Sequence, residues 1–133
     1  MNTQELKERT KQFALRTMRL SDALPKSAKA QAIARQIVRS GTSVAANYRA
    51  ACRARSRAEF IARIGVVEEE ADETALWLEL IVADKILDQK KVLPLLNEAN
   101  ELVAIMAASY ISAGRNGASA PRKSAVRTQQ SEI

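Results

Sequence analysis

Apolar and small side chains recur at intervals of three and four positions through the first 113 residues, a spacing that predicts amphipathic helices. The first helix is expected over about residues 4–23. Pro25 ends it, because the residue before a proline avoids the helical conformation. Ser27 is expected to cap the start of a second helix, whose apolar line continues to Ala51.

The same spacing predicts two further helices. Ser56 and Glu59 form the Ser-x-x-Glu pattern of a capping box, so a third helix is expected to start there and to continue to about Leu87. Pro94 suits the first turn of a fourth helix, where its missing N–H breaks no hydrogen bond. That helix is expected to end with Gly114 at its C-cap.

The residues expected in the core form one line along each helix. On the first two helices these lines are Leu6, Thr10, Phe13, Thr17, Leu20 and Leu24, then Ala30, Ala34, Ile37, Gly41, Val44, Tyr48 and Ala51. On the other two they are Phe60, Ile64, Val67, Ala71, Thr74, Leu78 and Ile81, then Val92, Leu96, Ala99, Val103, Met106 and Tyr110. Four such helices with short loops predict an all-α fold, an antiparallel up-down-up-down four-helix bundle over residues 1–113.

Residues 114–133 lack this periodicity and are rich in turn-forming residues, with four basic side chains and one acidic side chain. We expect them to form a disordered, basic C-terminal tail. The chain of 133 residues is 47% hydrophobic and 4% aromatic, which suits a single helical domain followed by this tail.

Missing residue types argue against several kinds of chemistry. The chain has no histidine, which rules out histidine-based catalytic triads and argues against zinc or di-iron sites of the usual kinds. Its one cysteine, Cys52, stands among small apolar residues and is expected to fill packing space. A lone cysteine suits a reducing cytoplasm, and no apolar run is long enough to span a membrane. We therefore expect a cytoplasmic protein that is not an enzyme and has no cofactor or metal.

Small residues in the second helix predict close packing. Ser40, Gly41, Ser43 and Asn47 stand there at helical spacing. Glycine costs about 1 kcal/mol relative to alanine inside a helix, so a closely approaching helix is expected to offset Gly41. No base stands at helical spacing to activate these serines as nucleophiles. We expect the four residues to form a polar packing seam in which Asn47 hydrogen-bonds across helices.

Charge is sorted along the chain. Residues 26–63 contain nine Lys or Arg and one acid, Glu59, whereas residues 64–101 contain ten Asp or Glu and three Lys. The net charge of +6 therefore conceals a dipole. One interpretation is that neighbouring helices pair these charges in surface salt bridges. Another is that the basic face of one copy meets the acidic face of the next in a head-to-tail assembly.

A third interpretation concerns the turn between the second and third helices. Four arginines surround it: Arg49, Arg53, Arg55 and Arg57. Guanidinium groups bind phosphate oxygens well, so these residues are candidate contacts to RNA or DNA, with an affinity that falls as salt rises.

Apolar residues outside the main lines indicate either a partner surface or wider core faces. On the third helix they are Val66, Trp77 and Leu80, and on the fourth they are Leu95, Leu102 and Ile105. The oligomer-interface hypothesis names Trp77, Leu80, Glu69 and Glu73. Glu69 with Glu73 or Asp72 has a spacing that could hold a hard cation, but no matching acidic pair stands elsewhere. A solvated acidic face or a subunit contact explains them more simply.

The string ARQIVRSGTSVAANYR at residues 34–49 resembles a known bacterial family. So do SRAEFI at residues 56–61 and the acidic stretch before LWLEL at residues 76–80. They are similar to four-helix-bundle proteins first noticed as reading frames in intervening sequences of 23S ribosomal RNA genes. The resemblance covers about residues 5–113.

That family is in turn similar to the accessory variability protein of diversity-generating retroelements, a barrel-like homopentamer that associates with nucleic acid and a reverse transcriptase. The resemblance implies a homo-oligomer, expected to be a pentamer, and association with nucleic acid. Our favoured hypothesis is a non-enzymatic homo-oligomeric bundle that acts as an accessory in nucleic-acid transactions. The alternative is a scaffold for assembly or for docking another protein, without nucleic-acid binding.

Overall fold

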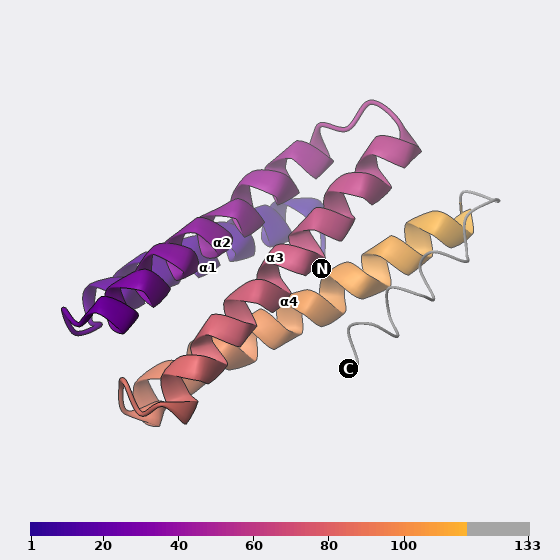
Figure 1. Cartoon of the computed structure of the whole chain (residues 1–133). Helices are drawn as coiled ribbons and strands as arrows, with labels where there is room; N and C mark the ends of the chain where they lie inside the picture. The colour runs from indigo at the N-terminus through magenta and orange to yellow at the C-terminus, as the bar shows by residue number, and fades with distance from the viewer. Residues whose placement is uncertain (117–133) are drawn as a thin grey trace.

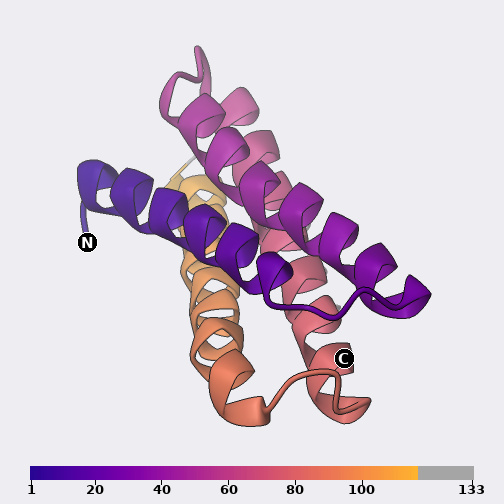
Figure 2. The same cartoon turned by 90° about the vertical axis from the view of Figure 1, so that its left-hand side faces the viewer.

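The computed structural model describes residues 1–116, which form four α-helices. They are α1 (Thr3–Asp22), α2 (Ala28–Cys52), α3 (Arg57–Ala83) and α4 (Gln89–Asn116). Consecutive helices run antiparallel and pack most closely against their neighbours in the chain (Figure 1 and Figure 2). The predicted all-α, up-down-up-down four-helix bundle is confirmed. From residue 117 onward, the predicted basic tail lies outside the described residues.

Serine side chains cap α2 and α3 as predicted. Ser27 and Ser56 each accept a hydrogen bond from the backbone N–H three residues further on. The second half of the predicted capping box is different, because the Glu59 carboxylate accepts from the backbone N–H of Arg55, at 3.1 Å, rather than from Ser56. The acid thus stabilises the turn before α3 and not the cap itself.

The end of α3 and the start of α4 differ from the prediction. The third helix ends at Ala83, four residues early, because Lys85 takes a left-handed conformation with φ 56°. The Ile86 N–H then bonds the Ile81 carbonyl at 2.9 Å, the pattern of a Schellman motif. A glycine usually marks this motif. Here Lys85 occupies the left-handed position and the apolar spacing continues past it, so the end of α3 could not be predicted from the sequence.

Helix α4 is longer at both ends than predicted. It begins at Gln89, where the Asp88 carboxylate accepts from the backbone N–H of Lys90 at 3.0 Å. Pro94 therefore lies inside the helix, in its second turn, and not in its first turn as predicted. Gly114 is part of α4 rather than its C-cap, since the helix continues to Asn116.

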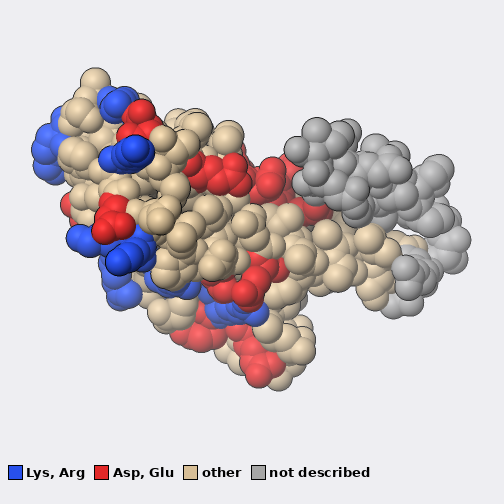
Figure 3. Space-filling model, turned by 90° about the horizontal axis from the view of Figure 1, so that it is seen from below, with Lys and Arg blue, Asp and Glu red and all other residues tan. Residues whose placement is uncertain are grey.

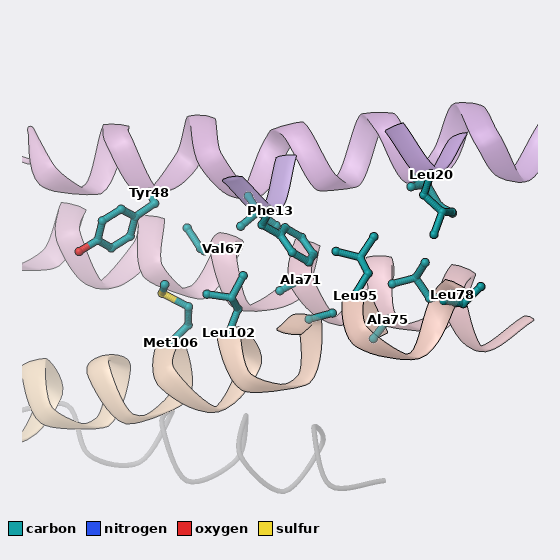
Figure 4. Packing of buried hydrophobic residues seen from close by; sticks show 14 of the residues in the cluster. Phe13, Leu20, Tyr48, Val67, Ala71, Ala75, Leu78, Leu95, Leu102 and Met106 are labelled. Carbon is teal, nitrogen blue, oxygen red and sulfur yellow. The ribbon is translucent and has the colours of Figure 1, made fainter. Parts of the chain in front are cut away.

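The core fills the space between the four helices (Figure 4). The predicted lines on α1 and α2 are buried throughout, and the line on α3 is buried except for the half-buried Phe60. On α4 the line was wrong at two positions, because Leu95 and Leu102 are buried while their neighbours Leu96 and Val103 are half-buried. Both members of each neighbouring pair are apolar, so helical periodicity alone could not choose between them.

Small and polar residues hold α2 against both of its neighbours. A β-carbon added to Gly41 would lie within 2.7 Å of three side-chain atoms of Thr17 in α1, so only glycine allows this approach. On the side of α3, the buried hydroxyls of Ser40 and Thr74 are 2.7 Å apart. Thr74 donates to the carbonyl of Glu70, so Ser40 is the donor in that pair.

The two outer helices, α1 and α4, contact each other less closely, and α1 passes obliquely across α4 (Figure 2). An ion pair joins them. The Arg9 guanidinium binds both carboxylate oxygens of Glu98, at 2.6 and 2.8 Å, and one oxygen of Glu101 at 2.6 Å. Hydrogen bonds to Glu98 are the main reason why the pKa of Arg9 is raised above its ordinary value. This contact closes the bundle on its open side.

Candidate nucleic-acid interface

The four predicted phosphate contacts lie at one end of the bundle. Arg49 is in the last turn of α2, Arg53 is its C-cap, Arg55 is in the turn and Arg57 begins α3. All four side chains are exposed. Because the helices are antiparallel, the start of α1 and the end of α4 lie at this same end (Figure 1).

None of these four arginines forms an ion pair with a carboxylate within residues 1–116. The only acid close in sequence, Glu59, binds a backbone N–H instead. By comparison, Arg9 and Arg39 pair with acids of another helix, and Lys29 pairs with Asp84, the C-cap of α3. Positive charge at the α2–α3 end therefore remains available to a ligand.

Two arginines at this end have neutral partners. Arg57 donates to the carbonyl of Ala113 near the end of α4, at 3.4 Å. Arg63 donates to the side-chain oxygen of Asn47 at 3.1 Å, a bond from α3 to α2. Hydrogen bonds of this kind orient a guanidinium group without neutralising its charge. A helix C-terminus carries partial negative charge, which also favours a cation such as Arg57 there.

A groove beside Arg49 brings in two lysines that the sequence interpretation missed. It lies between α1 and α2, encloses about 490 Å³ and has a floor of small residues that includes Ala45. Lys7 and Lys11 from α1 line it together with Arg49, and Glu8 is the one acid among its lining residues. The predicted topology could have indicated these lysines, because antiparallel pairing places the start of the first helix beside the end of the second.

The remaining residues of the predicted polar seam form a short network. Asn47 donates from its amide nitrogen to the carbonyl and the hydroxyl of Ser43, each at 2.9 Å, and accepts from Arg63 of α3. Both Asn47 and Ser43 are half-buried. With the buried Ser40 and Gly41, they make α2 the helix through which α1 and α3 are joined.

The acidic run of α3 does not form one face. Because successive helical residues are rotated by about 100°, Glu69 and Asp72 point to solvent while Glu68 is only 2% exposed. The solvated acidic face expected for Glu69 and Asp72 therefore does not extend to Glu68. Burial of Glu68 was not predictable from the run itself, since three consecutive glutamates are normally exposed.

Glu70 and Glu73 contact Arg39 of α2, so the salt-bridge interpretation of the charge pattern holds at this position. The Trp77 indole N–H also donates to Glu73, at 3.1 Å. Burial alone would raise the pKa of the Glu73 carboxyl, but the hydrogen bonds from Arg39 and Trp77 outweigh it and hold that pKa below its ordinary value. The hydrogen bonds that Arg39 donates, first to Glu73 and then to Glu70, raise the pKa of Arg39.

The four proposed interface residues therefore lie in different surroundings. Trp77 is half-buried and packs against the core, and Glu73 is held within the subunit. Leu80 is 40% exposed and Glu69 is exposed. A residue that the sequence interpretation omitted, Leu76, is more exposed than Leu80, at 48%. Most of the apolar residues outside the main lines are buried or half-buried and so widen the core faces of α3 and α4; Leu80 is the exception.

Other candidate chemistry finds no support in the geometry. Within the described part of the chain, no three His, Cys, Asp or Glu side chains are grouped so that they could hold a metal ion. Cys52 is half-buried against the core, near Tyr48. Burial of the phenol, followed by the proximity of Cys52, raises the pKa of Tyr48 to about 12. None of the helices in residues 1–116 has an apolar stretch that would cross a bilayer.

Comparison with known proteins agrees with this fold. The family model described as 23S rRNA-intervening sequence protein matches residues 2–108. A crystal structure of a Bacteroides thetaiotaomicron protein, described as having unknown function and belonging to the S23 ribosomal protein family, superimposes with a TM-score of 0.73 and 33% identity. The match covers 78% of this chain and 96% of that one. No curated protein matches the sequence significantly. The chain belongs to the 23S rRNA-intervening sequence protein family.

Proposed function

We propose that this protein is a non-enzymatic, homo-oligomeric helical bundle that associates with nucleic acid through the α2–α3 end. The observation that carries the proposal is the group formed by Arg49, Arg53, Arg55 and Arg57, all exposed and none paired with a carboxylate within residues 1–116. Arg9 and Arg39, by comparison, are neutralised by acids of another helix, so their charges are not available in the same way.

The expected contacts are to the phosphate backbone. Guanidinium groups can bind phosphate oxygens with two hydrogen bonds, and each neutralised phosphate releases counterions. Lys7 and Lys11 extend the positive surface along the groove beside Arg49. The five aromatic residues of the chain do not form a stacking platform for bases: Phe13, Tyr48 and Tyr110 are buried, and Phe60 and Trp77 pack against the core. Binding should therefore depend on backbone charge more than on base sequence.

The homo-oligomeric part of the proposal rests on the outer face of α3. Leu76 and Leu80 are one helical turn apart, and both remain exposed in the single chain. Asp72 and Glu79 are exposed on the same helix. Exposed leucines bordered by acids suit contact with a basic surface of another copy. The same observation favours the second candidate function, a scaffold that docks a different protein without binding nucleic acid.

Binding of labelled duplex DNA and of a structured RNA, measured by fluorescence anisotropy, tests the proposal. The Arg53→Ala, Arg55→Ala, Arg57→Ala triple variant should bind at least about tenfold more weakly at low salt. The matched control removes three positive charges elsewhere, as Arg16→Ala, Arg19→Ala, Lys91→Ala, and should bind almost as well as the wild type. Equal losses in both variants would mean that only net charge matters. Unchanged binding in the first variant would rule out the α2–α3 arginines as the contact, and no binding by the wild type at low salt would leave the scaffold function.

A further inference from the structure

A second basic site lies at the opposite end of the molecule from the α2–α3 arginines. Figure 3 shows basic side chains gathered at its left-hand end, where the α1–α2 and α3–α4 connections lie. A hollow of about 290 Å³ is located at this end, between α1 and the start of α4. It is lined by Arg16, Arg19, Leu20, Ala23, Leu87, Lys91, Pro94 and Leu95.

The hollow has a cationic rim and no acid. Arg16 and Arg19 come from α1 and Lys91 comes from the first turn of α4, so the three charges approach from two helices. No carboxylate is among the lining residues, and none of the three cations forms an ion pair within the described chain. These charges do not stabilise each other, so the arrangement favours an anionic ligand.

The floor of the hollow is apolar. Leu20 and Leu95 are almost fully buried, Leu87 is half-buried, and Ala23 and Pro94 complete the surface. A ligand that fills this floor needs an apolar group of its own, since a polar group would lose hydrogen bonds to water there. The volume of about 290 Å³ suits one or two aliphatic side chains better than a long hydrocarbon chain.

Nucleic acid satisfies only half of these requirements. Its phosphates would suit the rim, but the floor offers no aromatic ring on which a base could stack and no donor or acceptor side chain to read one. A peptide that carries leucine-like side chains between carboxylates satisfies both, with its apolar groups on the floor and its acids at the rim.

We propose that the hollow formed by Arg16, Arg19, Lys91 and the three leucines is a docking site for an acidic, leucine-containing peptide segment of another protein. The site is separate from the α2–α3 arginines, so one molecule can hold nucleic acid at one end and a partner protein at the other. The proposal therefore stands independently of whether the α2–α3 end binds nucleic acid.

The test uses a short fluorescein-labelled peptide in which two leucines one helical turn apart are flanked by glutamates. Anisotropy titration of the full chain should give a dissociation constant on the order of tens of micromolar. The Arg16→Ala, Arg19→Ala, Lys91→Ala variant should bind the peptide about tenfold more weakly, because three charge contacts are lost. A peptide with serine in place of both leucines should lose a similar factor. The Arg53→Ala, Arg55→Ala, Arg57→Ala variant should bind the leucine peptide as the wild type does.

Several outcomes overturn the proposal. Absence of binding up to about 1 mM peptide does so directly. Equal binding of the serine peptide would show unspecific attraction between charges, and displacement of the peptide by duplex DNA would assign the site to nucleic acid. A lower native mass of the Arg16, Arg19, Lys91 variant in light scattering would mean that a second copy covers the hollow. The circular dichroism of each variant shows whether it is folded, and an Arg16→Gln, Arg19→Gln, Lys91→Gln variant, which removes the same charges but keeps longer side chains, is used if the alanine variant does not fold.

Discussion

The backbone of α2 at Gly41 touches the side chain of Thr17 in α1, and no side chain fits between them. Glycine inside a helix normally costs about 1 kcal/mol relative to alanine. Here the cost is offset by the approach of the two helices, which the buried Thr17 hydroxyl accommodates by donating to the carbonyl of Ala14 at 2.7 Å. This contact fixes how α1 lies on α2, and hence where Lys7 and Lys11 stand relative to Arg49.

Substitution of Gly41 by Ala should therefore destabilise the protein despite the higher helix propensity of alanine. The new methyl group would overlap Thr17, and overpacking of this kind costs about 1–3 kcal/mol. Urea unfolding followed by circular dichroism measures the change. A second substitution, Thr17→Ala, removes two of the three overlapping atoms and should restore part of the loss. A stabilised Gly41→Ala variant would show that the helices do not approach so closely.

The two ion-paired arginines should differ in their contribution to stability. The side chains of Arg9 and Glu98 are only 23% and 16% exposed and form a bidentate ion pair. The side chain of Arg39 is 47% exposed. Replacement of Arg9 by Ala should cost about 1–3 kcal/mol of unfolding free energy, because it leaves the partly buried Glu98 without its partner. Replacement of Arg39 by Ala should cost less than about 1 kcal/mol. Urea midpoints at neutral pH give both values, and the reverse order would contradict the role of Arg9 in closing the bundle.

Glu73 should contribute to the loss of stability in acid. Its pKa in the folded protein lies below the ordinary value of 4.5, so the ionised carboxylate stabilises the fold above that pH, and this contribution disappears as the pH falls through the folded pKa. The Glu73→Gln variant should be less stable than the wild type at pH 7 and should lose less stability between pH 5 and about pH 3. Thermal unfolding across this range measures the difference. Glu79→Gln, an exposed residue of the same helix, is the control and should follow the wild type.

The exposed leucines of α3 provide a test of self-association. Leu76→Glu combined with Leu80→Glu should lower the native mass measured by light scattering, because two charges would enter an apolar contact. Helicity should stay the same, since both side chains are exposed in the single chain. Met18→Glu on α1 combined with Leu93→Glu on α4, where the side chains are 45% and 37% exposed, is the matched control for two added charges. An unchanged mass in the double variant would remove this face from the proposed interface.

Much of this fold could be predicted from the sequence, because each helix has a regular apolar line and recognisable caps. The buried lines of α1 and α2 follow directly from the spacing of residues such as Phe13 and Ile37. Prediction failed where two choices were equally apolar, as at Leu95 and Leu96, and where the helix end depends on the backbone conformation of Lys85. These outcomes are decided by packing between helices, which a single helical pattern does not contain.

The candidate site was predictable only in part. The arginines around the α2–α3 turn are visible as a run, but whether a charge is paired depends on the register between helices. The register between α2 and α3 places Arg39 beside Glu70 and Glu73, and Arg39 pairs with both. Arg53 is exposed and has no acidic partner within residues 1–116. The basic hollow around Arg16 and Lys91 combines residues 75 positions apart, which only the fold brings together.

The salt dependence of nucleic-acid binding tests the central claim most directly. The logarithm of the binding constant for duplex DNA should fall linearly with the logarithm of salt concentration, with a slope of about −0.9 for each phosphate contacted. If Arg53, Arg55 and Arg57 each contact a phosphate, their replacement by Ala should reduce the steepness of the slope by about 2 to 3. The Arg16, Arg19, Lys91 control variant should keep the wild-type slope. Parallel lines for the wild type and the Arg53, Arg55, Arg57 variant would contradict the account.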